Sequence, residues 1–266
     1  TGTAAVAAQL ALHDALRDAD VRAPLWCATR AAVSVAGEAA PGAAQAPLWG
    51  VSRALDTGGG MVDLPHRLEA RSLGLLAAAL TDPADADELA VRTGGLFARR
   101  LHADPPAPRT PRPWRTGGTV LVTGDVASVT GDLLRMLSGD GERPVVLARR
   151  PGTAAAVDDG SCGVVEWDPA AGAPETPSPV TAVVHLDNIQ PPAAPDIAPS
   201  DLAAAVGDRL HTVDRLTELF GDQDLDAFVL LSSVAGTWGG AEDVVHTVVH
   251  AALESAAERR AAAGLR

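Results

Sequence analysis

Two histidines lie one helical turn apart near the end of the sequence, in a segment whose pattern predicts a helix. His246 and His250 follow Asp243, so the three side chains would share one face of that helix. Imidazole and carboxylate groups at this spacing can bind zinc or move a proton. A third and a fourth ligand at suitable spacing are not apparent. We therefore predict no metal site and interpret the pair as residues of a half-buried helix.

The composition restricts the classes of function. The chain has 266 residues, of which 47% are hydrophobic, a formal net charge of -13, and neither tyrosine nor lysine. The length and apolar content predict a substantial core, in one large domain or two modest ones. The negative charge argues against nucleic acid and anionic membranes as partners, since both need a basic patch.

Cysteine usage and hydropathy indicate a soluble, cytoplasmic protein. Cys27 and Cys162 are far apart and lack metal-type spacing, so we expect reduced thiols. No apolar run approaches the ~20 residues that span a bilayer, and the N-terminus lacks the pattern of a signal peptide. We therefore expect no insertion into a membrane.

Strand and helix patterns alternate along the chain and are interrupted at the proline- and arginine-rich segment His102–Thr116, which we interpret as a linker. Before it we expect helices at Ala4–Leu16, Trp49–Leu55 and Leu68–Leu80, and strands at Leu25–Val35, Gly60–Leu64 and Leu89–Leu101. After it we expect strands at Thr119–Val122, Pro144–Ala148, Val180–His185 and Leu225–Ser232, and helices at Gly131–Leu137, Asp201–Phe220 and Asp243–Ala262.

This alternation predicts an α/β protein with two tandem Rossmann-like subdomains, in which helices flank parallel sheets. We place the first subdomain, with its proline-rich linker, at residues 1–115 and the second at residues 116–266. The segment Asp168–Val180 is too rich in proline for a full crossover helix between two strands.

Four segments, in the same order, resemble the ketoreductase domain of modular polyketide synthases, a branch of the short-chain dehydrogenase/reductase superfamily. They are PLWGVSRAL (Pro47–Leu55), GTVLVTG (Gly118–Gly124), LDAFVLLSSVAGTWGG (Leu225–Gly240) and the last helix. The resemblance covers most of the chain. It implies a truncated structural subdomain followed by a catalytic-like subdomain that lacks the substrate lid and the C-terminal segment.

In this family a serine, a tyrosine, an asparagine and a lysine reduce the ketone. The resemblance places the serine at Ser233, the tyrosine at His246, the asparagine at His250 and the lysine at Arg209. The tyrosine hydroxyl would protonate the developing alkoxide, and an imidazole is shorter and presents its donor elsewhere. A planar guanidinium does not replace a compact ammonium. Of the four groups, only the serine is retained.

The resemblance implies NADPH as the family cofactor, but its binding positions are altered. The family turn TGGTGGLG corresponds to TGDVASVT here. Of the three glycines that let the pyrophosphate approach, only Gly124 remains, Ser128 and Thr130 replace the other two, and Asp125 adds a carboxylate beside a dianion. The arginine pair that would bind the 2′-phosphate we interpret as solvated. We therefore expect no cofactor. The degenerate candidate positions are Gly124, Ser128, Thr130, Arg149, Arg150, Asp168 and Asn188.

The resemblance leaves three functions open. We favour an inactive, structural ketoreductase-like domain that leaves the β-keto group of a phosphopantetheine-bound intermediate unreduced. The alternatives are a redox-silent epimerase that uses His246, and an NADPH-dependent β-ketoacyl reductase. Trp238 occupies the position of the tryptophan that guides the substrate in one stereochemical class. The implied partners are the acyl carrier protein, ketosynthase and acyltransferase domains of the same module, with dimerisation through other domains.

Overall fold

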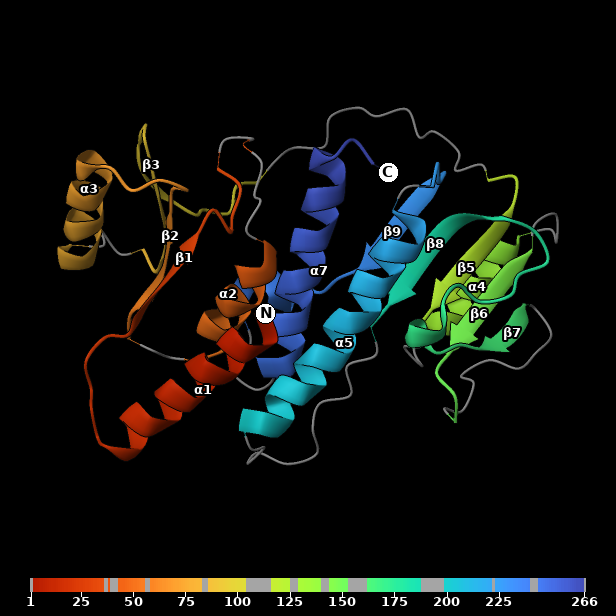
Figure 1. Ribbon diagram of the computed structural model, residues 1–266, viewed down its shortest axis with the longest axis horizontal. Coiled ribbons are helices and arrows are strands. Elements are labelled where there is room, and N and C mark those ends of the chain that lie inside the picture. The colour runs from red at the N-terminus through yellow and green to blue at the C-terminus, as the bar shows by residue number, and fades with distance from the viewer. Residues whose placement is uncertain are drawn as a thin grey trace. The chain divides into compact units, whose positions relative to one another are not determined.

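The chain folds as alternating helices and strands that build two separate sheets (Figure 1). The computed structural model describes residues 2–35, 38, 43–55, 58–82, 86–103, 116–124, 129–139, 144–152, 162–187, 199–221, 223–239 and 244–265. The centre of the predicted linker, residues 104–115, lies outside these ranges. The α/β class predicted from the sequence is confirmed.

The elements follow the predicted order. In the first half they are α1 (Gly2–Asp18), β1 (Trp26–Arg30), the 3₁₀ turn η1 (Ala43–Gln45), α2 (Ala46–Ala54), β2 (Gly60–Leu64), α3 (Ala70–Thr81), β3 (Glu88–Arg92) and β4 (Gly95–Ala98). In the second half they are β5 (Thr119–Thr123), α4 (Thr130–Ser138), β6 (Val145–Arg149), β7 (Gly163–Glu166), the 3₁₀ turn η2 (Pro169–Ala171), β8 (Val180–Leu186), α5 (Pro199–Phe220), β9 (Ala227–Leu231), α6 (Val234–Trp238) and α7 (Val244–Ala262). Every predicted helix and strand has a counterpart.

The chain divides into two compact units built from separated segments. Unit 1 contains Thr1–Thr110, Pro192–Gly207 and Val234–Arg259. Unit 2 contains Pro111–Pro191, Asp208–Ser233 and Arg260–Arg266. Helices α5 and α7 therefore contribute residues to both units. The subdomain boundary that we place at residue 115 remains a prediction.

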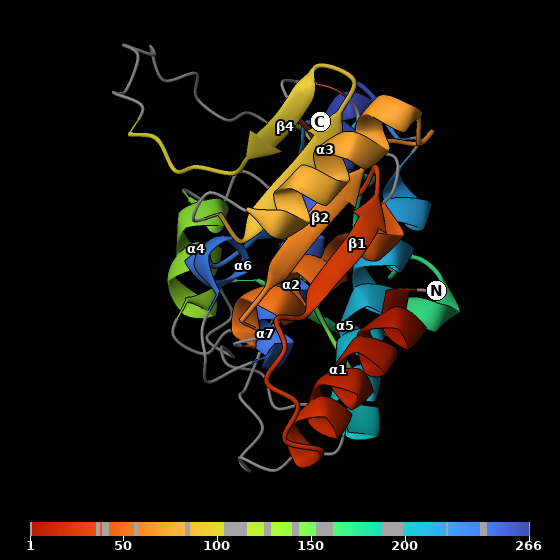
Figure 2. The ribbon, with the colours of Figure 1, turned by 90° about the vertical axis from the view of Figure 1, so that its left-hand side faces the viewer.

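Unit 1 contains a four-stranded sheet in the order β1-β2-β3-β4. The first three strands are parallel and β4 is antiparallel to β3. The single strand region expected at Leu89–Leu101 is thus a hairpin, because only two residues connect its strands and a parallel crossover needs many more. Helix α3 covers one face of this sheet and α2 lies on the other (Figures 1 and 2).

Unit 2 contains a five-stranded, fully parallel sheet in the order β7-β6-β5-β8-β9. Alternating residues of the strands point to opposite faces. One face packs on Leu134 and Leu137 of α4, and the other packs on Leu216 and Phe220 of α5. Helices on both faces of a parallel sheet are the arrangement predicted for a Rossmann-like subdomain.

The connection between β7 and β8 contains η2 and no α-helix, as the proline-rich sequence of Asp168–Val180 predicts. Strand β7 and the five-residue helix α6 were not predicted. Among the described helices, none combines the length and the apolar content that a bilayer-spanning segment requires.

Candidate functional site

The carboxyl ends of β5 and β8 mark the topological switch point of the unit 2 sheet. In chain order the strands are arranged 3-2-1-4-5, so the connections leave β5 and β8 in opposite directions. Open α/β sheets bind their ligands in the crevice at this point. The residues that follow β5 and β8 are therefore the first to consider.

Gly124, the first residue after β5, has a left-handed backbone with φ 77°. A Cβ atom built on it would lie 1.7 Å from the carbonyl oxygen of Leu186 on β8. No side chain fits in that space. This glycine is therefore required by the packing of the two strand ends, whether or not a phosphate binds beside it.

The rest of the predicted phosphate turn is partly described. Thr130 begins α4 and is fully buried, so a side chain fills the position that the family motif gives to a glycine. Ser128 and Asp125 lie outside the described residues, as does Asn188 beyond the end of β8.

Both arginines at the position where the family binds the 2′-phosphate are paired with carboxylates. Arg149, at the end of β6, lies 3.4 Å from the Glu166 carboxylate of β7. Arg150 pairs with the Asp208 carboxylate and donates a hydrogen bond of 2.8 Å to the Thr212 hydroxyl. Arg149 therefore links β6 to β7, and Arg150 links the end of β6 to α5.

Asp168, the remaining candidate of this group, accepts a 2.9 Å hydrogen bond from the backbone N–H of Ala170. It therefore caps η2, which gives its carboxylate a local structural contact.

Two titratable groups that the sequence analysis did not identify lie at the end of β8. His185 is buried, and its Nδ1 lies 2.8 Å from the Thr123 hydroxyl on β5. Burial, with a smaller contribution from Arg150, lowers the pKa of His185 to about 4. Asp187 lies one residue beyond the strand, and its Oδ1 is 3.6 Å from Nε of Arg209 on α5. A carboxylate directly after an apolar strand is the sequence signal that could have identified it.

The four positions that correspond to the family's catalytic serine, tyrosine, asparagine and lysine are divided between the units. Ser233, half-buried just beyond β9, and Arg209 belong to unit 2, whereas His246 and His250 belong to unit 1. On α7 the two imidazole rings contact each other edge to face, with centroids 4.2 Å apart and planes at 68°. His250 is 4% exposed. The rings are therefore packed as a pair, and Asp243 lies outside the described residues.

The described residues contain no group of three or more histidine, cysteine, aspartate or glutamate side chains that could hold a metal ion. The absence of a metal site stays a prediction for the whole chain.

The motif glycines of unit 1 lie where helices meet closely. A Cβ atom on Gly50 of α2 would lie 2.5 Å from Cα of Val248 on α7. A Cβ atom on Gly236 of α6 would lie 2.8 Å from the backbone of His250 and from the Glu254 carboxylate. These glycines therefore allow α2 and α6 to approach α7 closely.

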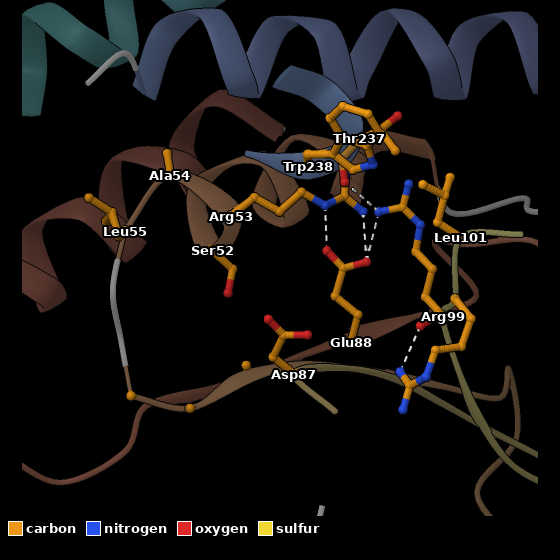
Figure 3. A pocket seen from close by; sticks show the side chains of 14 residues that line it. Ser52, Arg53, Ala54, Leu55, Asp87, Glu88, Arg99, Leu101, Thr237 and Trp238 are labelled. Carbon is orange, nitrogen blue, oxygen red and sulfur yellow. Dashed lines mark hydrogen bonds and ion pairs between the residues drawn. The ribbon is translucent and has the colours of Figure 1, made fainter. Parts of the chain in front are cut away.

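A charged cluster with side chains from α2, β3 and the end of β4 lines an open pocket of about 580 Å³ in unit 1 (Figure 3). Arg53 of α2 and Arg99, just after β4, flank the carboxylate of Glu88 on β3, and Arg99 also donates to the Thr237 carbonyl at 2.9 Å. Burial would raise the pKa of Glu88, but the two arginines lower it below its usual value. Trp238 lines this pocket and is 63% exposed.

Comparison with known proteins is consistent with this geometry. The family model described as "KR domain" matches residues 170–266. Polyketide synthase GfsA from Streptomyces halstedii is 38% identical over 98% of this chain, and pikromycin polyketide synthase component PikAIII from Streptomyces venezuelae is 34% identical over 96%. A solved structure of an A1-type ketoreductase superimposes with a TM-score of 0.83 and 34% identity over 97% of the chain. The chain belongs to the ketoreductase domain family of modular polyketide synthases.

This ketoreductase domain spans only part of its relatives. It covers 4% of the length of GfsA, 18% of PikAIII and 60% of the A1-type ketoreductase chain. The two curated relatives are large multidomain polyketide synthases. Members of the ketoreductase family normally use NADPH.

Proposed function

We propose that this ketoreductase domain carries out no reduction and acts as a structural part of a polyketide synthase module. The observation that carries the proposal is the packed imidazole pair on α7, because His246 and His250 stand at the tyrosine and asparagine positions and contact each other. A phenol that donates a proton to the alkoxide is absent, since the chain contains no tyrosine. The β-keto group of the intermediate therefore leaves the module unchanged.

The described residues fit NADPH poorly, which supports the same proposal. The Thr130 side chain is buried where the motif has a glycine, and Arg150 is engaged by Asp208. Asp187 adds a carboxylate beside the switch point, where a bound dinucleotide would bring further negative charge. Each of these features weakens the binding of NADPH. A loss of about 1.4 kcal/mol in binding free energy lowers the affinity tenfold.

Calorimetric titration with NADPH tests this proposal directly. We expect no saturable heat up to millimolar NADPH, and no consumption of NADPH with a β-ketoacyl thioester of N-acetylcysteamine. An active ketoreductase domain measured in parallel shows that the substrate and the assay are competent. Saturable binding in the micromolar range, or turnover that disappears in His246→Phe, would contradict the proposal.

The structural role has its own test in the complete module. We propose that the domain keeps the ketosynthase, acyltransferase and carrier domains at workable separations. Deletion of the domain should then lower the rate of product formation, whereas His246→Phe should leave the rate unchanged. Full turnover of the deleted module would contradict the spacing role without restoring any case for reduction.

One observation favours a second function, the redox-silent epimerase. His246 is half-buried and keeps a titratable group at the proton-donor position. An epimerase would exchange the α-deuterium of a carrier-bound 2-methyl-3-ketoacyl substrate, and His246→Phe would abolish the exchange. Retention of the deuterium by the wild-type domain would exclude this function.

A further inference from the structure

The switch point of the unit 2 sheet carries a buried carboxylate. Thr123 of β5 pairs with His185 of β8, so the residues that follow these strands, Gly124 and Asp187, lie at the same edge of the sheet. The crevice at this edge is where parallel sheets of this order bind ligands.

The surroundings of Asp187 are those of an enclosed ion pair. Its side chain is 9% exposed and that of Arg209 is 21% exposed. Oδ1 faces the Arg209 guanidinium, and Oδ2 is buried without a hydrogen-bond partner among the described residues. Removal of one member of such a pair leaves the other charge in a poorly solvated position. The carboxylate and the guanidinium therefore depend on each other.

The other titratable groups near Asp187 have contacts of their own. Arg150, from the end of β6, engages Asp208, the neighbour of Arg209 on α5. His185, the nearest titratable group on β8, contacts the Thr123 hydroxyl. Asp187 therefore places a carboxylate against the Arg209 guanidinium at the switch point.

We infer that Asp187 serves as an internal anion that occupies the Arg209 guanidinium and so closes the switch-point crevice to phosphate-like ligands. This inference deepens the proposed function, because it assigns the loss of anion binding to one residue. It also adds to the defects in the glycine turn.

The test uses sulfate, a dianion whose charge is constant over the pH range of the experiment. We expect the melting temperature of Asp187→Asn to rise with sulfate in a saturable manner, with an affinity at least roughly tenfold above that of the wild-type chain. The double variant Asp187→Asn with Arg209→Gln should lose this response. Glu218→Gln is the matched control, since it removes the same charge from the exposed pair with Arg215.

The wild-type chain provides a second measurement. Burial raises the pKa of Asp187 to about 6, against the charges of Arg209 and Arg150 and with a contribution from Asp208. Protonation at pH 5 should remove the Asp187 charge that faces Arg209, so sulfate should stabilise the wild-type chain more at pH 5 than at pH 7.5, and Asp187→Asn should lack this difference.

If Asp187→Asn fails to fold, Asp187→Ala replaces it. A folded variant that shows no more sulfate binding than the wild-type chain and the Glu218→Gln control would overturn the inference. So would a sulfate response that survives Arg209→Gln. Either result leaves the proposed loss of reduction untouched, because that proposal is tested with NADPH and a ketone.

Discussion

Two buried titratable residues at the end of β8 respond to acid in opposite directions. The pKa of His185 is lowered from 6.5 to about 4, so the stability gained from the neutral ring is present above 6.5 and is lost as the pH falls toward 4. The pKa of Asp187 is raised from 3.8 to about 6, so its contribution is present below 3.8 and is lost as the pH rises through 6. Between pH 6.5 and 4 the two contributions therefore offset each other.

In the variant Asp187→Asn, the stability that protonation of His185 costs at low pH should no longer be offset. We expect the unfolding free energy of this variant to fall by about 2 kcal/mol more than that of the wild-type chain between pH 7 and pH 4.5. Urea unfolding at several pH values measures the difference, and the comparison cancels the other carboxylates. Parallel pH profiles for the two proteins would show that Asp187 does not titrate as described.

The contact between the ends of β5 and β8 also predicts a large effect of a single methyl group. Gly124→Ala should destabilise unit 2 by several kcal/mol, since the new Cβ would meet the Leu186 carbonyl oxygen. Gly152 has the same φ of 77° and open space around its Cβ position, so Gly152→Ala carries the backbone strain alone. Equal losses in denaturant unfolding would show that the close approach is unimportant.

At the scale of elements, α2 depends on one glycine for its contact with α7. Gly50→Ala should destabilise unit 1 by several kcal/mol, because its Cβ would overlap the α7 backbone at Val248. Gly74 of α3 has nothing within 4 Å of its Cβ position, so Gly74→Ala should stabilise the chain by about 0.5 to 1 kcal/mol. Thermal unfolding of both variants measures the contrast, and a neutral Gly50→Ala would contradict the close packing.

Elements with a strong apolar pattern were predictable, and short ones were not. β2 has the predicted bounds, Gly60–Leu64, since its five residues are all buried. β7 was missed because Gly163–Glu166 offers two apolar residues on a largely exposed strand. Helix α6 was missed because its five residues form between a strand end and a glycine, where tertiary contacts rather than propensity fix the backbone.

In the candidate site, too, some features were predictable from the sequence and others were not. The positions of Ser233, Arg209, His246 and His250 followed from motif spacing, and they remain predictions. Spacing could not reveal that Asp187 and Arg209 form a pair, because the two residues come from different elements and their contact depends on the folded sheet.

For the whole molecule, the composition of the units predicts how fragments behave. Residues 1–115 include the unit 1 sheet but lack the α7 segment against which Gly50 packs. We expect this fragment alone to be molten, with retained helical circular dichroism and no cooperative thermal transition. The 266-residue chain, measured in parallel, should unfold cooperatively. A sharp transition of the fragment would contradict this expectation.

The tight glycine contacts also bear on how ketoreductase-like domains with substituted catalytic positions can be recognised. A catalytic side chain is free to drift once its reaction is no longer selected, whereas a methyl group at Gly50, Gly124 or Gly236 would collide with backbone or a neighbouring side chain. We consequently expect these glycines to be replaced more slowly during evolution than the catalytic side chains. Searches for ketoreductase-like domains with substituted catalytic positions should therefore weight these glycine positions above Ser233, His246, His250 and Arg209.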